Sequence, residues 1–144
     1  KNIMAVFDAF SKNYAPGQNN LLKQLLGGGF ESYIQSKVNW LVAELQSQAN
    51  WPSDASLRLL DFGCGTGEFL RLLTPDGFKG SVRGCDISRG MLETAVNRWD
   101  QASGPPFDHY SGNKLPYQEA SFDLIVSLAL PSLSTFFIAA PPFK

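Results

Sequence analysis

The sequence predicts an α/β fold, in which helices precede a parallel sheet of about four strands. From residue 57 onward, short apolar runs alternate with segments of helical periodicity, and glycine or proline punctuates the turns. Before residue 53, apolar residues recur only at helical spacing. A regular alternation of strand and helix is typical of a parallel sheet with helical crossovers.

The N-terminal third predicts helices. Residues 3–14 and the leucines of 21–26 have helical spacing, and Pro16 and the glycines at 27–29 end these segments. The clearest amphipathic helix lies in residues 30–50. One face of that helix carries its apolar residues, which are Ile34, Val38, Leu41, Val42 and Leu45.

Four apolar runs then predict strands, over residues 57–62, 81–86, 107–110 and 121–130. A helix should follow the first strand, ending at Pro75. A second helix should begin after the N-cap Ser88. Its inner face is predicted to hold Met91, Leu92, Ala95, Val96 and Trp99.

Bulk composition excludes several classes of protein. The 144 residues suit one domain, and 44% hydrophobic with 17% charged residues is ordinary for a globular fold. A net charge of −1 without a basic run argues against a nucleic-acid partner. Since neither a signal peptide nor an apolar run of about 18 residues is visible, we expect a cytoplasmic protein that does not enter a membrane.

The most informative stretch is LLDFGCGTGEFL, residues 59–70, where a strand gives way to a helix. Gly63, Gly65 and Gly67 would let the chain turn tightly and let a ligand approach the backbone. Asp86 lies 19 residues beyond Gly67, at the end of the next strand. A carboxylate there can accept hydrogen bonds from both hydroxyls of a ribose, so the pattern predicts a nucleoside ligand.

Glu68 distinguishes this turn from the dinucleotide-binding pattern G-x-G-x-x-G, because it stands where that pattern has its third glycine. A glutamate in the first helical turn would occupy the positive end of the helix and repel a pyrophosphate. The expected ligand therefore lacks phosphates and carries positive charge. The alternative is that Glu68 only stabilises the start of the helix.

Cysteine and histidine are too few for a metal site. Cys64 and Cys85 are the only cysteines and His109 the only histidine, whereas a structural zinc needs four ligands. We expect two buried free thiols and no metal. His109 is predicted to be structural, and Asp108 to be an exposed charge at a strand end.

Three motifs now carry a family resemblance. LLDFGCGTGEFL, VRGCDISRGMLETA and LPYQEASFDLIVS, between residues 57 and 128, resemble in order the motifs of class I S-adenosylmethionine-dependent methyltransferases. FDAFSKNYAPGQ, near the N-terminus, is similar to a segment of members that act on small molecules. The resemblance implies a Rossmann-like parallel sheet, incomplete because the sequence supplies about four of the family's seven strands, with a truncated or divergent C-terminus.

The resemblance implies three regions: a helical lid or cap over residues 1–53, the cofactor-binding core over 54–130 and a divergent tail over 131–144. The tail should either return as a hairpin against the fourth strand or form a short helix over residues 132–140. An unpaired edge of the fourth strand would favour self-association.

The resemblance also implies the residues that bind the cofactor. Asp61 and Gly63 would face its methionine end, Asp86 would hold the ribose, and Ile87 and Met91 would pack near the adenine. The full set is Asp61, Gly63, Cys64, Gly65, Thr66, Gly67, Asp86, Ile87, Met91, Ser111, Gly112, Ser127, Leu128 and Tyr14.

Five of these positions, Ser111, Gly112, Ser127, Leu128 and Tyr14, lie outside the first two motifs. Ser111, before Gly112, stands where the family often has an acidic residue that contacts the adenine amine, so the bond there would lack charge assistance; Asn113 is the alternative partner. Ser127 and Leu128 would bring a backbone carbonyl to the cofactor's ammonium group. Tyr14 would cover the cofactor as part of the lid, or would only pack against the fold.

The predicted function is transfer of a methyl group from S-adenosylmethionine to a small-molecule acceptor, leaving S-adenosylhomocysteine. The sequence identifies no catalytic base. The second hypothesis is a cofactor-binding remnant or truncated isoform without activity. The third, which Glu68 and the LPYQEASFDLIVS motif disfavour, is a nicotinamide-dependent oxidoreductase.

Overall fold

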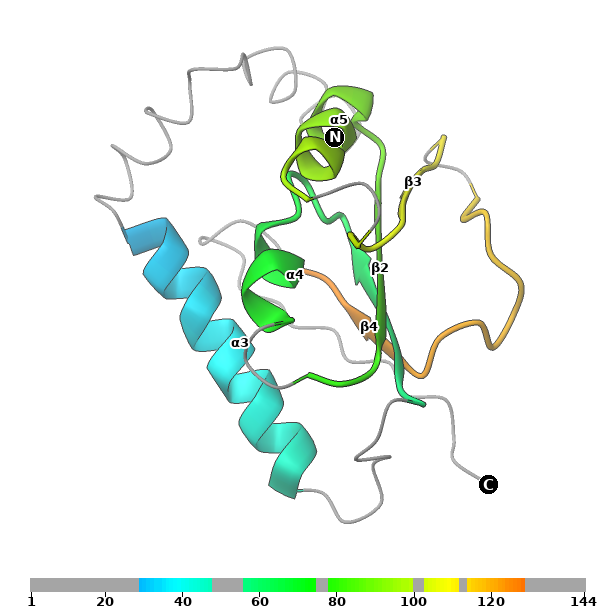
Figure 1. Ribbon diagram of the computed structural model, residues 1–144. Coiled ribbons are helices and arrows are strands. Elements are labelled where there is room, and N and C mark those ends of the chain that lie inside the picture. Colours follow the sequence, from blue (N-terminus) through cyan, green and yellow to red (C-terminus); the bar gives the residue numbers. More distant parts are fainter. Residues whose placement is uncertain (1–28, 48–55, 75–77, 100–102, 112–113, 129–144) are drawn as a thin grey trace, which may run out of the picture.

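The computed structural model describes residues 29–47, 56–74, 78–99, 103–111 and 114–128 (Figure 1). The elements, in chain order, are α3 (Gly29–Ser47), β1 (Arg58–Phe62), α4 (Glu68–Leu73), β2 (Ser81–Asp86), α5 (Arg89–Asn97), β3 (Phe107–His109) and β4 (Leu124–Val126). Every strand and helix that the sequence predicts between residues 57 and 126 is present. The helices expected before residue 27 and the tail element expected at 132–140 lie outside the described residues.

The four strands form one parallel sheet in the order β3-β2-β1-β4. Two successive crossovers, through α4 and α5, move the chain outward from β1 to β2 and then to β3. The chain then returns to the other side of β1 and adds β4, which is an edge strand of the described sheet. This order confirms the predicted Rossmann-like fold, and the reversal beside β1 is where such sheets bind ligands.

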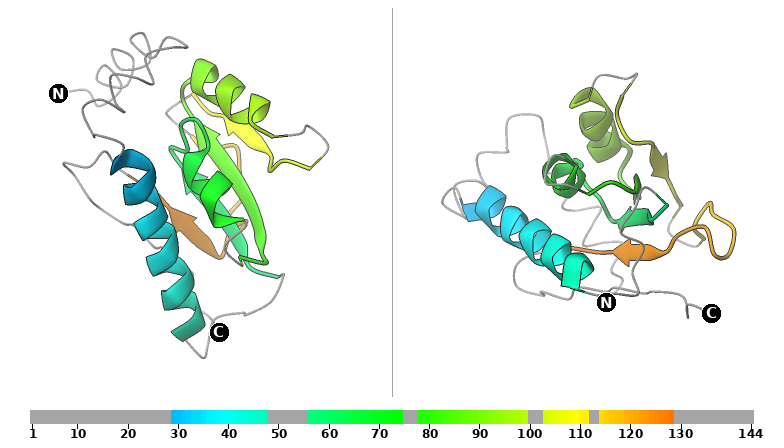
Figure 2. Two further views of the ribbon diagram at one scale, coloured as in Figure 1. Left: turned by 60° about the vertical axis from the view of Figure 1, so that its left-hand side comes forward. Right: turned by 60° about the horizontal axis from the view of Figure 1, so that its bottom comes forward.

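Helices α3, α4 and α5 lie on one face of the sheet (Figure 2). Right-handed crossovers in the same direction place α4 and α5 there, and α3 joins them by packing on α4. Helix α3 packs on α4, while α5 packs on β2 and β3. The core between α3, α4 and the sheet consists of aliphatic and aromatic side chains, namely Ile34, Val38, Leu41, Leu59, Phe69, Leu70, Leu73, Leu124 and Val126. The predicted apolar face of α3 is therefore confirmed, with Val42 and Leu45 partly buried at its margin.

The opposite face of the sheet carries a polar cluster that corrects one prediction. Asp108 was expected to be an exposed charge, but its carboxylate accepts hydrogen bonds from Arg83 Nη1 and from the Tyr117 hydroxyl, both at 2.7 Å. The expectation failed because neither partner is near Asp108 in sequence. A hollow of about 570 Å³ lies beside this cluster, at the amino-terminal ends of β1 and β2 and thus away from the glycine turn.

An ion pair fixes β4 against β1 at the same end of the sheet. Asp123 receives hydrogen bonds from Arg58 Nε at 3.0 Å, Arg58 Nη2 at 2.9 Å and the Arg58 backbone N–H at 2.9 Å. In return, the Asp123 N–H donates to the Arg58 carbonyl at 2.9 Å. Although β4 is only three residues long, these contacts set its register, in which Val126 lies beside Asp61.

Helix α5 has a narrower buried face than the sequence predicts. Leu92 and Ala95 are buried, but Val96 is 39% exposed, so its assignment to the inner face was wrong. Met91 and Trp99, the other residues predicted for that face, are partly buried. None of the described helices is both long and apolar enough to cross a membrane.

Replacing Leu70 by alanine should lower the free energy of unfolding by about 2–5 kcal/mol, because Leu70 is fully buried in the core. Val96→Ala on the exposed side of α5 is the control and should change stability by less than about 0.5 kcal/mol. Denaturant unfolding measures both. Equal losses in the two variants would contradict the placement of the core.

Candidate functional site

The turn between β1 and α4 has a backbone that only glycine adopts readily. Gly63, Gly65 and Gly67 have φ angles of 73°, 55° and 76°. At Gly67 the space is also closed, since a Cβ there would lie 3.0 Å from Trp99 Cζ3 and 3.1 Å from Phe107 Cζ. The alternating glycines are therefore required by conformation at all three positions and by packing at the third.

The turn is held to β2 by its own backbone. The N–H groups of Gly63 and Cys64 both donate to the carbonyl oxygen of Cys85, at 2.9 and 3.0 Å. The Gly67 N–H donates to the carbonyl oxygen of Cys64 at 2.9 Å. No local sequence signal pointed to the Cys85 carbonyl as an anchor, because its role depends on the pairing of β1 with β2.

Asp86 joins the glycine turn to the start of α5. Its Oδ2 accepts the N–H of Gly65 and its Oδ1 accepts the N–H of Ser88, both at 2.8 Å. The side chain is buried, at 8% exposure. Each carboxylate oxygen can accept a further hydrogen bond, so Asp86 can still receive a ligand hydroxyl.

Asp61, at the carboxyl end of β1, is a buried acid that lacks a hydrogen bond. It is 2% exposed, and among the described residues its Oδ2 has no hydrogen-bond partner. Burial, and secondarily the charge of Asp86, raise the pKa of Asp61 to about 8. A cationic donor placed here would meet the carboxylate's hydrogen-bonding need and favour its ionised form.

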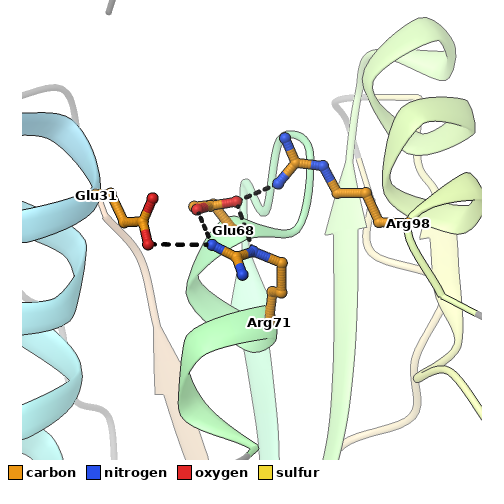
Figure 3. Close-up of polar contacts among 4 residues, drawn as sticks. All are labelled: Glu31, Glu68, Arg71 and Arg98. Atoms are coloured by element: carbon orange, nitrogen blue, oxygen red, sulfur yellow. Dashed lines mark hydrogen bonds and ion pairs between the residues drawn. The ribbon is translucent and has the colours of Figure 1, made fainter. Parts of the chain in front are cut away.

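Glu68 behaves differently from the prediction (Figure 3). Its carboxylate does not stand alone at the helix start: Arg71 Nη2 donates to Oε1 at 2.6 Å, and Arg71 Nε and Arg98 Nη1 donate to Oε2. Glu68 is therefore not the bare, phosphate-repelling charge that the sequence predicts. Helical neighbours compensate that charge, and Arg98 comes from a helix whose position the sequence alone does not give.

The backbone supplies a better reason against a phosphate ligand. Loops that cradle phosphates present unpaired N–H groups to the oxygens. Here the N–H groups of Gly63, Cys64, Gly65 and Gly67 all donate to acceptors within the protein. These four N–H groups are therefore not free to bind a phosphate.

Of two further predicted residues, Met91 lies beside the turn and Cys64 lies within it. The Sδ atom of Met91 lies 3.5 Å from the position that a Cβ on Gly65 would occupy, so Met91 lies against the turn, and its packing on an adenine stays a prediction. Cys64 contributes its backbone, because its thiol is buried against Gly84. Both cysteines are buried and free, as predicted, and burial raises the pKa of Cys85 to about 11.

The remaining predicted residues fall at the ends of neighbouring strands or outside the described chain. Ser127 and Leu128 are partly buried just beyond Val126, which is the register partner of Asp61. Ser111 is exposed beyond the end of β3, and Thr66 is partly buried within the turn. Gly112 and Tyr14 lie outside the described residues.

His109 holds the backbone next to Asp86. Its Nε2 lies 3.1 Å from the carbonyl oxygen of Ile87, and Ile87 is itself partly buried. This contact supports the structural role that the sequence predicts for His109. Trp99 was expected only as a core residue, and its packing on Gly67 was missed because that contact joins two different crossovers.

Comparison with known proteins assigns the chain to a protein family. A methyltransferase domain matches residues 59–137, which is more than half of the chain. The chain belongs to the class I S-adenosylmethionine-dependent methyltransferases. The match includes the glycine turn, Asp86 and all four strands except the first residue of β1.

Three similar proteins illustrate the range of the family. Demethylmenaquinone methyltransferase of Thermotoga maritima is 28% identical over 125 residues, which is 87% of this chain and 47% of that protein. A probable 18S rRNA (guanine-N(7))-methyltransferase of Dictyostelium discoideum is 36% identical over 73 residues, 51% of this chain and 24% of that protein. Magnesium protoporphyrin IX methyltransferase from Synechocystis with bound S-adenosylmethionine is 28% identical, with a TM-score of 0.56 over 84% of this chain and 54% of that one.

The chain thus spans about half the length, or less, of these relatives. The relatives differ in acceptor, as their names include a quinone precursor, a porphyrin and an RNA. Family membership therefore establishes the fold and the class of enzyme, and leaves the acceptor to be proposed.

The ligand-free protein should become less stable as pH rises from about 4 to about 8, because of Asp61. Its pKa is 3.8 ordinarily and about 8 in the fold, so within this interval the folded state keeps a proton that the unfolded chain has released. The free energy of unfolding should fall by up to about 1.4 kcal/mol per pH unit. Denaturant unfolding across this interval measures the slope.

Asp61→Asn is the control, since the amide resembles the protonated acid in shape and charge. Its stability should be nearly constant in the range where the wild-type curve falls. Parallel curves for the two proteins would show that Asp61 does not carry the raised pKa.

Proposed function

We propose that this chain binds S-adenosylmethionine at the carboxyl ends of β1 and β2 and forms the cofactor-binding part of a methyltransferase for a small-molecule acceptor. The buried Oδ2 of Asp61, which has no partner among the residues that the structure describes, carries the proposal. A fully apolar or anionic ligand would leave that oxygen unsatisfied, whereas the ammonium group of S-adenosylmethionine is a cationic donor.

The residues of the site fit different parts of this cofactor. Asp61, with the turn from Gly63, would take its methionine end, and the remaining lone pairs of Asp86 would accept the ribose hydroxyls. Met91 and Ile87 offer an apolar flank beyond the ribose, where an adenine can pack. Ser111 offers a neutral hydroxyl near the end of β3, and Ser127 and Leu128 extend β4 alongside Asp61.

When bound, the cofactor supplies a methyl group on a positively charged sulfur, which is already activated toward displacement. The work left to the chain is to orient the cofactor and to keep it fixed while an acceptor approaches in line. The twice-anchored Asp86 and the rigid glycine turn suit that task. We assign no catalytic base, since the described residues place none beside the glycine turn other than the two binding carboxylates.

The proposed acceptor is a small molecule. The absence of a basic run from the sequence and the net charge of −1 support this proposal over an RNA acceptor. The Thermotoga and Synechocystis relatives, which carry the longer matches, are named for small-molecule acceptors. A cofactor-binding form without transfer activity is the second candidate, because the chain spans only about half of those relatives.

Isothermal calorimetry with S-adenosylhomocysteine, S-adenosylmethionine and NAD tests the proposed ligand. The first two should bind, and Asp86→Ala should weaken both by about 10- to 100-fold because a charged acceptor is lost. Unfolding of the variant is measured in parallel, since Asp86 also anchors Gly65 and Ser88. Glu31→Ala, an exposed acid on α3, is the control and should bind normally. Binding of NAD alone would overturn the proposal.

Proton release adds a second test of the same site. Below about pH 8 the ligand's ammonium group should expel the proton from Asp61, so binding enthalpies should depend on the ionisation enthalpy of the buffer. Asp61→Asn should abolish that dependence and weaken binding.

A screen of small acceptors and RNA for methyl transfer from labelled cofactor then separates the catalytic form from the binding form.

A further inference from the structure

Helix α5 lies alongside the glycine turn and is tied to it at its N-terminal end by Asp86. That carboxylate receives the Gly65 N–H from the turn and the Ser88 N–H from the start of α5, each at 2.8 Å. Ser88 then caps the helix by accepting the N–H of Met91 at 3.3 Å. The first half of the turn and the first turn of α5 thus form one hydrogen-bonded unit.

A second tie joins the other end of α5 to the end of the same turn. Gly67 is in close contact with Ala95 and Trp99, since a Cβ on it would lie 3.3 and 3.0 Å from their side chains. The next residue, Glu68, accepts a hydrogen bond from Arg98, the C-cap residue of α5 (Figure 3). Two contacts of different kinds, one steric and one ionic, therefore meet at adjacent residues.

The ionic tie has properties that most surface ion pairs lack. The side chain of Glu68 is only 14% exposed and that of Arg98 27%, so solvent screens the pair less than a surface pair. Burial opposes ionisation of Glu68, but the hydrogen bonds and charges of Arg71 and Arg98 outweigh it and lower the pKa of Glu68. The carboxylate is thus charged at neutral pH and accepts bonds from both guanidinium groups.

We infer that Glu68 is a positioning residue for the glycine turn, residues 63–67. It acts through Arg98, which fixes the C-terminal end of α5 against that turn. The inference rests on the proposed function, because it concerns how the turn is held ready for its ligand. Asp86 fixes one end of the turn and the Glu68–Arg98 pair fixes the other. If the Glu68–Arg98 pair is removed, the C-terminal end of α5 can move while its N-terminal end stays bound to Asp86. That movement should weaken the Gly65–Asp86 hydrogen bond.

Arg71 provides a matched control within the same cluster. It also binds Glu68, at 2.6 Å, but it belongs to α4, and its other partner is the exposed Glu31 of α3, at 3.6 Å. Removing Arg71 therefore takes a cation from the same carboxylate without cutting the tie to α5. A role limited to stability would make the Arg71 and Arg98 variants equivalent.

The experiment compares Arg98→Gln, Glu68→Gln and Arg71→Gln with the wild type in the full chain. Amide hydrogen exchange at Gly65 is measured without ligand, together with the dissociation constant for S-adenosylhomocysteine and the unfolding midpoint. Arg98→Gln and Glu68→Gln should each speed Gly65 exchange and weaken binding by about 3- to 10-fold, and the double variant should be no worse than either single one. Arg71→Gln should lower the midpoint but leave Gly65 exchange and binding near wild type. Arg98→Lys, which keeps the charge, should recover part of the loss.

The outcomes separate the inference from the function on which it rests. If the wild type does not bind S-adenosylhomocysteine, the proposed function fails. If the wild type binds but Arg98→Gln matches Arg71→Gln in both Gly65 exchange and affinity, the positioning role is wrong and the proposed function stands. If Glu68→Gln does not fold, Arg98→Gln decides, since it changes a residue at the end of a helix.

Discussion

The site depends on one interaction, the two hydrogen bonds that the Asp86 carboxylate accepts from Gly65 and Ser88. They require three things at once. β2 must pair with β1 in the observed register, Gly65 must adopt a positive φ angle, and α5 must begin directly after the turn that follows Asp86. Because all three are met by rigid secondary structure, the same carboxylate is held in one orientation before any ligand arrives, and little ordering is left to binding.

The rest of the turn follows from that constraint. Beside this anchor, the N–H groups of Gly63 and Cys64 donate to the Cys85 carbonyl, and the N–H of Gly67 donates to the Cys64 carbonyl. With these N–H groups paired, the carboxylates of Asp61 and Asp86 are the polar groups that we propose for the ligand. Asp61 supports the proposed site, because its Oδ2 has no hydrogen-bond partner in the described part of the chain and such a buried oxygen is costly unless a ligand completes it.

Much of this architecture could be predicted from the sequence. The periodicity of apolar residues located each strand and helix between residues 57 and 126, and β2 was predicted at its observed bounds. The glycines and Asp86 identified the edge of the sheet where a ligand would bind, because strand ends and turn residues are local signals. Family motifs then named the ligand class, although its contacts with individual residues are still predictions.

The predictions that failed concern contacts between distant segments. Asp108 looked like a free charge because its partner Arg83 comes from another strand. Glu68 has one partner, Arg98, from another helix and a second, Arg71, that lies three residues along α4 and that its spacing could have indicated. Val96 looked buried because a helical pattern does not reveal how wide a strip of α5 the sheet covers. The lack of a partner for Asp61 Oδ2 among the described residues could not be predicted either. Periodicity shows that a residue is buried, but it does not show which of its atoms lack a hydrogen bond.

The contact between Arg58 and Asp123 has a consequence at the far end of the sheet. It pins the first residue of β1 to the residue that precedes β4, and side chains alternate strictly between the faces of a sheet. An extra residue inserted between Asp123 and Leu124 would therefore turn Leu124 and Val126 out of the core and turn Ile125 into it. The end of β4 that lies beside Asp61 is thus aligned by a pair of charges at the opposite end of the strand.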